Sequence, residues 1–281
     1  MSIRKHLTWD GSKYRGFVDV GTGEVQDDSA PVAKEALVVM AVCVNSTWKV
    51  PLGYFLVNGL TGEERANVIK ICIERLCETG VEVVSVTCDG PSCHFAMLSA
   101  LGASLSPANL QACFPHPLKV GKSIYIFMDV CHMLKLVRNT FAELGILVDG
   151  ENGKISWRYI TELQKLQDKE GLRLANKLKQ DHIRWYQQKM KVNLASQTIS
   201  SSVADAIEYC ATHLKMPQFE GSGATVKFIR TFDRLFDILN SRNPFARGYK
   251  SINQFQQLGS CPSAVVFRMR CLRAFQKHLL Q

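Results

Sequence analysis

The 281-residue sequence lacks several features that would assign it to a familiar class. It has ten cysteines, but no two are spaced as C-x-x-C, which argues against a zinc ribbon or a thioredoxin-like site. Several cysteines lie in apolar runs, so we expect buried, reduced thiols and a cytosolic or nuclear compartment. There is no G-x-x-x-x-G-K-[ST] loop, so any nucleotide site is not a P-loop.

Long hydrophobic runs are also missing. No stretch reaches about 18 uninterrupted apolar residues, so we expect no transmembrane helix, and the opening MSIRKHLTWDGS has no apolar core of a secretory signal. The sequence does have 46% hydrophobic and 21% charged residues, which is normal for a globular protein with a sizeable core. Its formal net charge of +9 favours an acidic partner such as nucleic acid.

The first half of the sequence alternates between predicted strands and helices. Segments 35–44 and 49–57 are predicted to form a hairpin, with Pro51 at an edge or bulge. Thr61 and Glu64 have capping-box spacing and start a helix. Further strands are expected over 14–20, 81–88 and 123–128, and further helices over 94–101 and 131–144. This order predicts an α/β fold, a mixed sheet with helical crossovers.

Asp89 ends the most strand-like run, which begins at Val81 and is expected to be a buried strand. Open α/β sheets bind ligands at the carboxyl ends of their strands. Asp19 and Asp129 also fall at expected strand ends, and carboxylates gathered by a sheet suit a two-Mg²⁺ site for phosphoryl transfer. An Asp-Gly pair such as Asp89-Gly90 is equally an ordinary turn signal, so the residues alone leave both interpretations open.

Two other interpretations use neighbouring residues. His132, in the first turn of the helix after Asp129, would allow a generic α/β hydrolytic enzyme together with Asp89. The histidine is also compatible with plain capping or packing. A soft-metal site would need cysteine and histidine ligands, but the spacing of the candidates fits no zinc template. Those candidates are Cys88, Cys93, Cys131, His94 and His132.

After about residue 150 helices are expected over 157–192, 200–214 and 226–239, with no convincing strand. Basic residues in 189–193 precede hydroxyl residues in 197–202, and such a helix entry suits a phosphate. Asp237 and Asn240 are one helical turn apart and could read the donor edge of a purine. The alternative is a polar helix surface with Asn240 as C-terminal cap.

At these residues the sequence resembles the P element-type DNA transposases, a family that includes the THAP-domain transposases of vertebrates. The similar stretches run in family order over about residues 1–250. They are Gly16–Gly21, Val86–Gly90, Asp129–Asn139, Gly171–Leu178, Lys189–Val192, Ser200–Ala206 and Phe232–Arg242.

The resemblance implies an RNase H-like mixed sheet with helical crossovers, followed by an all-helical insertion domain that binds GTP. On this basis residues 1–145 form the RNase H-like catalytic region and residues 146–250 form the insertion domain. Residues 251–281 are a divergent tail, expected to be poorly ordered. The family carries out Mg²⁺-dependent DNA strand cleavage and transfer, with GTP as a positioning cofactor.

The resemblance also assigns roles to residues. Asp89 matches the second acid of an Asp-Asp-Glu set that holds the metal ions, and Asp19 is a candidate for the first acid, unless that acid precedes Met1. Asp237 and Asn240 would contact the guanine, with Phe236 packing beside it. Four further residues match positions around the nucleotide: Lys177, Lys191, Val192 and Ser200.

The sequence departs from the family pattern in its ends. The THAP zinc domain and coiled coil are absent, and no glutamate matching the third acid follows the insertion domain. We therefore expect a catalytically incomplete transposase core, and the alternative is a non-catalytic, transposase-derived nucleotide- or DNA-binding module. The expected partners are transposon ends, target DNA, GTP and a second copy of the chain, in the nucleus and without a membrane.

Overall fold

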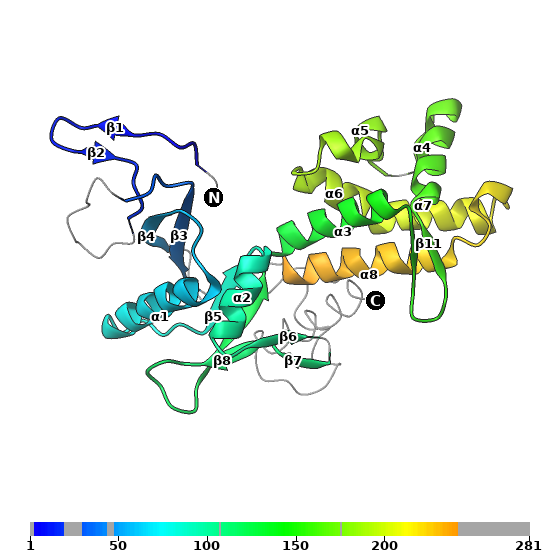
Figure 1. The fold of residues 1–281 in the computed structure, drawn as a ribbon. Helices are drawn as coiled ribbons and strands as arrows, with labels where there is room; N and C mark the ends of the chain where they lie inside the picture. Colours follow the sequence, from blue (N-terminus) through cyan, green and yellow to red (C-terminus); the bar gives the residue numbers. More distant parts are fainter. Residues whose placement is uncertain (1–2, 20–29, 44–47, 107, 175, 241–281) are drawn as a thin grey trace. The chain divides into compact units, whose positions relative to one another are not determined.

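The computed structural model describes residues 3–19, 30–43, 48–106, 108–174 and 176–240 (Figure 1). The expectation for the tail, 251–281, lies outside the described residues. Two compact units divide the chain. Unit 1 comprises residues 1–84, 91–104 and 113–124, and unit 2 comprises 85–90, 105–112 and 125–281. Each unit is described by itself.

The largest strand pair of unit 1 is the antiparallel hairpin of β3 (Glu35–Val42) and β4 (Lys49–Val57). Its register shifts between Val39 and Met40, where Met40 pairs with Pro51. This irregularity confirms the bulge expected at the proline, which has no N–H to donate to the ladder. The pairing of Glu35 with Val57 closes the open end of the hairpin.

Helix α1 (Gly62–Glu78) begins with the predicted capping box. The Glu64 amide donates to Thr61 Oγ1 over 3.2 Å, and the Thr61 amide donates to Glu64 Oε2 over 2.8 Å. These bonds satisfy the Glu64 amide, which has no partner within the helix, and the amide of the cap residue Thr61. The buried Arg65 then pairs with Glu35 Oε2 at 3.0 Å, which fastens the start of α1 to β3.

Shorter elements complete this part of the chain. The strand predicted over 14–20 is reduced to β2 and two isolated bridges, Phe17 with Val32 and Asp19 with Leu56. Glycine at position 16, with φ of 115°, interrupts the run. The shorter elements are β1 (Thr8–Trp9), β2 (Tyr14–Arg15), α2 (Ser92–Ala100), β6 (Ser104–Ser106), β7 (Asn109–Gln111) and β8 (Cys113–Pro115).

Strand β5 (Ser85–Cys88) pairs in parallel with β9 (Ser123–Met128), and the sheet order is β5-β9-β8. The prediction of a buried strand from Val81 is wrong in extent and burial. β5 has only four residues, and only Cys88 in it is buried. The physical reason is that β5 lies at the edge of this sheet. An edge strand is ordered and covered by one neighbouring strand instead of two.

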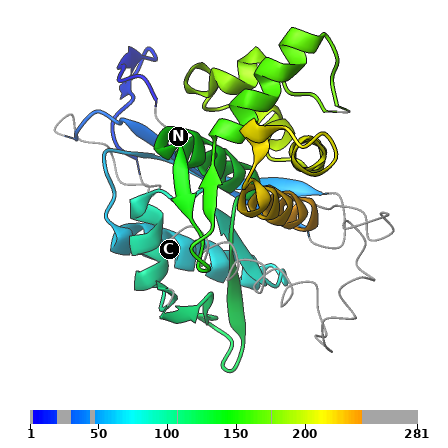
Figure 2. The ribbon, with the colours of Figure 1, turned by 90° about the vertical axis from the view of Figure 1, so that its right-hand side faces the viewer.

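Unit 2 is mainly helical. Figures 1 and 2 show α7 and α8 side by side, with α3 along α8 and α4 standing across α7. Its core includes Phe141, Trp157, Ile207 and Phe232. The elements are α3 (Val130–Leu144), β10 (Ile146–Val148), β11 (Lys154–Ser156), α4 (Arg158–Glu170), α5 (Gln180–Ile183), the 3-10 turns η1 (Trp185–Gln187) and η2 (Pro217–Phe219), α6 (Val192–Thr198), α7 (Ser201–Thr212) and α8 (Gly223–Leu239).

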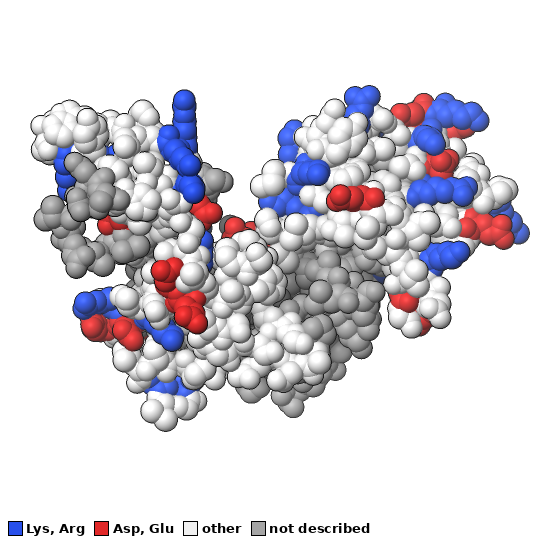
Figure 3. Space-filling view, in the orientation of Figure 1, with Lys and Arg blue, Asp and Glu red and all other residues white. Residues whose placement is uncertain are grey.

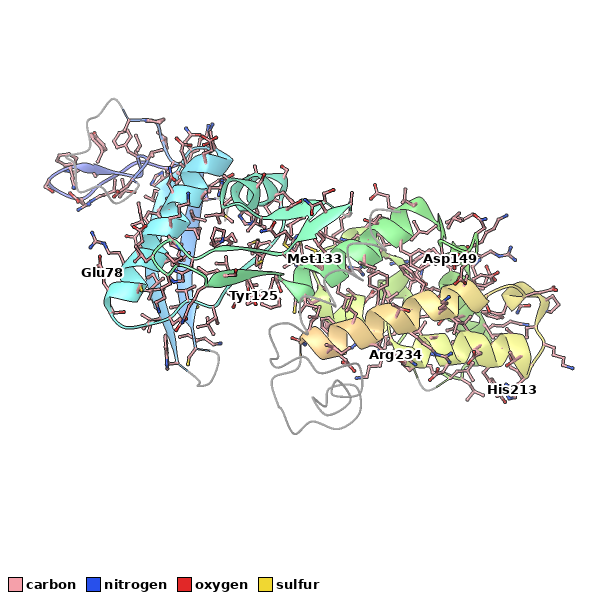
Figure 4. The ribbon with its side chains drawn as sticks, turned by 90° about the horizontal axis from the view of Figure 1, so that it is seen from below. Glu78, Tyr125, Met133, Asp149, His213 and Arg234 are labelled. Carbon is pink, nitrogen blue, oxygen red and sulfur yellow. The ribbon has the colours of Figure 1, made fainter. Side chains whose placement is uncertain are left out.

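Two features of this region differ from the sequence-based expectation. The helix predicted over 157–192 ends at Glu170, because Gly171 adopts the left-handed conformation (φ 68°) and caps it. In addition, β10 and β11 form an antiparallel hairpin in a region expected to have no strand. Asp149 Oδ1 accepts from the Glu151 and Gly153 amides and so organises the connecting turn (Figure 4).

The surface of the described residues carries mixed charge. On the face in Figure 3, the Lys and Arg side chains of each unit are interspersed with Asp and Glu rather than gathered in one patch. None of the helices in the described ranges is long and apolar enough to cross a membrane.

Two glycines at the first position of 17-residue helices make a matched test of packing. A Cβ on Gly62 would lie 2.6 Å from Ala96 Cβ and 2.7 Å from the Ala96 carbonyl carbon, whereas a Cβ on Gly223 would meet nothing within 4 Å. We predict that Gly62→Ala destabilises the protein by about 1–3 kcal/mol through overpacking against α2. Gly223→Ala should be neutral or stabilising by up to about 1 kcal/mol. Urea unfolding followed by circular dichroism measures both, and equal effects would contradict the packing argument.

Candidate functional site

The carboxyl ends of β5 and β9 bring two acids to one edge of the sheet. Asp89 directly follows β5 and its side chain is exposed. Asp129 directly follows β9, and its amide donates to the Cys88 carbonyl over 2.9 Å. The Asp129 carboxylate caps α3 by accepting from the Cys131 amide at 3.0 Å. Asp129 therefore has a structural task, while Asp89 presents its carboxylate to solvent beside it.

Asp19 lies in unit 1, where its backbone exchanges two hydrogen bonds with Leu56, at 2.8 and 2.9 Å. Asp89 lies in unit 2, so the pairing of these two acids at one metal site stays a prediction. Across the described ranges no group of three or more His, Cys, Asp or Glu side chains is arranged to hold a metal ion.

The residues expected around the nucleotide lie at the ends of three helices of unit 2. Lys191 is the N-cap of α6, with Val192 as its first residue, and Ser200 is the N-cap of α7. Phe236 and Asp237 lie in the last turn of α8, and Asn240 is its C-cap. Asn240 occupies the C-cap position through its backbone amide, which donates to the Phe236 carbonyl over 2.9 Å, and the contact of its side chain with a base stays a prediction. Lys177 is exposed in the segment between α4 and α5.

A pair of hydrogen bonds joins the start of α7 to the C-terminal half of α8. The amide and the hydroxyl of Ser201 both donate to Asp233 Oδ2, over 2.8 and 2.6 Å. Asp237 is four residues after Asp233, so it lies on the same helix face one turn further on. In Figure 4, His213, the C-cap of α7, lies at the end of the helix pair opposite to the C-terminus of α8. Ser200 and Asp237 are therefore brought to the same end of the pair.

The segment before α6 is anchored to α3. Arg138 of α3 is fully buried, and its Nη2 donates to the Gln188 carbonyl over 2.9 Å. The neighbouring Asn139 donates from Nδ2 to the Lys189 carbonyl over 3.3 Å. These contacts fix the backbone that leads into Lys191.

His182 of α5 completes this buried polar group. Its Nδ1 accepts from the Lys179 amide at 3.0 Å, so the neutral ring carries its proton on Nε2, which lies 3.0 Å from Gln197 Oε1. Burial lowers the pKa of His182, and the nearby positive charge of Arg138 lowers it further; the hydrogen bonds and Asp181 act in the opposite direction. The histidine ties α5 to α6 in its neutral form.

Three residues of this region were not predicted from the sequence: Arg138, His182 and Asp233. One signal for Arg138 was available, because it shares the apolar helix face of Leu134, Val137 and Phe141, where a charged residue is unusual. For His182 and Asp233 no signal was available, since their partners are distant in sequence. Ser201 lies within the hydroxyl residues 197–202 that the sequence had indicated.

Two protein-family models match different parts of the chain. Residues 1–102 match the family model of the TNP-like RNase H N-terminal domain, and residues 131–252 match that of the TNP-like GTP-binding insertion domain. The human DNA transposase THAP9 is 34% identical over 252 residues, which are 89% of this chain and 28% of the relative. The P transposase of Drosophila melanogaster is 27% identical over 200 residues, or 71% of this chain and 25% of the relative.

The chain belongs to the P element-type transposase family. It spans about a quarter of the length of these two curated relatives. The fold agrees with the Drosophila P element transposase strand transfer complex at a TM-score of 0.74 and 19% sequence identity, over 99% of this chain and 62% of that chain. The expected architecture, an RNase H-like region with a largely helical insertion domain, is confirmed.

The buried histidine predicts a pH dependence for the transposase insertion domain. Its pKa is lowered in the folded state, so the unfolded chain binds more protons once the pH falls below the unfolded value of about 6.5. The stability contributed by neutral His182 is thus complete above that pH and is lost as the pH falls below it. We predict that His182→Gln shows a smaller loss of urea midpoint between pH 7.5 and pH 5.5 than the unmodified chain. The exposed His213→Gln should keep the full loss. Identical losses in all three proteins would contradict this assignment.

Proposed function

We propose that unit 2 binds GTP at the end of the α7–α8 pair, as a positioning cofactor that is not hydrolysed. The observation that carries the proposal is the Ser201–Asp233 junction, which brings Ser200 to the end of α8 that bears Phe236 and Asp237. The match of residues 131–252 to a GTP-binding insertion domain supports it.

The base-reading end of this site is the last turn of α8. A carboxylate only accepts hydrogen bonds, and the Watson–Crick edge of guanine offers N–H donors where adenine has a ring acceptor. Asp237, which is half-buried, would accept from that edge and so select guanine over adenine. Phe236 packs against the core of the unit and would present its ring beside the base. Asn240 would add an amide to the same edge.

The phosphate end would lie at the entry to α6. Lys191 is exposed there, and so is Lys189, whose Nζ lies 5.2 Å from the centre of the Trp185 ring. Helix α6 has seven residues and is about 10 Å long, so its two ends can serve different parts of one nucleotide. Val192 would line the site between them, and Lys177 would add positive charge.

We further propose that the chain is part of a Mg²⁺-dependent DNA strand-cleavage and strand-transfer enzyme, in which Asp89 is a metal ligand and Asp19 a candidate second ligand. Asp89 suits this role as an exposed, hard oxygen ligand at a strand end. The metal would stabilise the attacking and leaving oxygens of the DNA backbone. Transposon ends and target DNA would be its substrates, in the nucleus, and a second copy of the chain would be a partner.

For this chain alone we propose that catalysis is incomplete. Residues 238–281 contain no Asp or Glu, so this part of the chain supplies no third acid for the metal site. Loss of one carboxylate from a metal site removes a ligand and lowers turnover sharply. A transposase-derived binding module that holds nucleotide or DNA without cutting it is the second candidate function, and the lack of an acid within residues 238–281 favours it.

The guanine assignment predicts a change of specificity. Asp237→Ala should weaken GTP binding by about 10- to 100-fold, the worth of a hydrogen bond to a charged group, and leave weak ATP binding unchanged. Asp205→Ala, an exposed aspartate on α7 that pairs with Arg230, is the matched control and should bind GTP as the unmodified chain does. Isothermal titration with both nucleotides measures the effect. Unchanged GTP affinity in Asp237→Ala would show that this carboxylate does not read the base.

The catalytic assignment predicts little strand transfer. With Mg²⁺ and a pre-cleaved transposon end, the chain should give no more strand-transfer product than its Asp89→Ala variant. A gel assay of joined DNA measures this. Robust transfer that Asp89→Ala abolishes would overturn the proposal of incompleteness and would establish Asp89 as a catalytic residue.

A further inference from the structure

Arg138 is a buried cation without an anionic partner among the described residues. Its side chain has 0% exposure, and no carboxylate in the described part of the chain forms an ion pair with it. Its Nη1 is buried without a hydrogen-bond partner in those same ranges. A buried guanidinium is costly to hold in a protein interior, and an apolar side chain of similar volume would often be no less stable there. Stability alone therefore does not explain why an arginine occupies position 138.

The hydrogen bonds of Arg138 all lead to one short segment. Nη2 donates to the Gln188 carbonyl over 2.9 Å, and that same carbonyl accepts the Lys191 amide at 3.1 Å. Nε donates to Asn139 Oδ1 over 2.8 Å, and Asn139 Nδ2 donates to the Lys189 carbonyl over 3.3 Å. Two adjacent carbonyls, those of Gln188 and Lys189, are thus held from α3.

This arrangement sets the direction of Lys191. The turn closed by the Lys191 amide on Gln188 fixes the residue that caps α6, and Arg138 holds the acceptor of that turn in place. Lysine has a long, flexible side chain, and its ordering is part of the free-energy cost of binding an anion. A backbone already fixed by two donors from α3 lowers that cost.

We infer that Arg138, together with Asn139, is a positioning residue for the phosphates of the bound nucleotide, acting through the Gln188–Lys191 segment. The inference rests on the proposed GTP site. Arg138 does not touch the nucleotide, because its side chain is fully buried. Its charge adds a favourable potential for phosphate from within a low-dielectric interior, where screening by salt is weak.

A merely structural role makes a different prediction. If Arg138 only supports the core, its loss should weaken the binding of every guanine ligand by the same factor. If it positions the phosphate-binding segment, the loss should grow with the number of phosphates, because guanosine does not use that segment. The ligand series guanosine, GMP, GDP and GTP therefore separates the two roles.

The test measures the affinity of the full chain for this series by isothermal titration, at two salt concentrations. Arg138→Gln should weaken GTP binding about tenfold or more and guanosine binding by less than about threefold. Arg158→Met, which removes an exposed arginine of the same unit, should leave the series unchanged and so controls for net charge. Equal losses for guanosine and GTP in a folded Arg138→Gln would overturn the inference.

A second variant keeps the test decisive if Arg138→Gln does not fold. Asn139→Ala removes only the bond to the Lys189 carbonyl and the acceptor of Arg138 Nε, from a half-buried position. It should produce a smaller loss with the same dependence on phosphate number, and unchanged GTP affinity would overturn the inference. Binding by the unmodified chain is the separate check on the proposed function. No GTP binding there overturns both proposals, whereas normal binding with an unaffected variant overturns only this one.

Discussion

Asp233 accepts two hydrogen bonds from Ser201, and the proposed nucleotide site depends on this contact. One carboxylate oxygen satisfies both the first amide of α7 and the Ser201 hydroxyl. Free amides at a helix start need such partners, and a negative charge there is also favoured by the helix dipole. The bond fixes the longitudinal register of α7 on α8. Core packing between the two helices and the ion pair of Arg230 with Glu208 support the same register.

Unit 2 contains two buried ionisable side chains, His182 and Arg138, whose polar atoms are satisfied in different ways. His182 is held neutral, with each ring nitrogen in a hydrogen bond, so its burial carries no charge. Arg138 is held charged and is only partly satisfied in the described residues. The first arrangement adds stability near neutral pH, while the second takes stability away unless an anion is bound nearby. If GTP binds as proposed, binding and folding in the insertion domain are linked through the same small group of residues.

The sequence-based predictions were accurate where the interactions join residues close together in the chain, and inaccurate where they join distant residues. Elements that are determined by residues close together in the chain were predicted. They are the capping box at Thr61, the β3–β4 hairpin, strand β9 and helices α7 and α8. The helix over 157–192 was predicted too long, since periodicity continued past a glycine that adopts the left-handed conformation. Strand β5 was predicted too long, because apolar composition cannot show that a strand lies at an edge.

By itself the sequence determined the family, through short motifs in the right order, and the chemistry of each candidate residue: carboxylates to bind metal or guanine, lysines to bind phosphate. It also showed that residues 238–281 contain no Asp or Glu. Only the tertiary structure decided that Ser200 reaches the end of α8 and that Arg138 holds the backbone before Lys191. The Ser201–Asp233 bond joins residues 32 apart in the sequence, and the Arg138–Gln188 bond joins residues 50 apart. Contacts between residues so far apart are determined by the packing of the fold and not by the local sequence pattern.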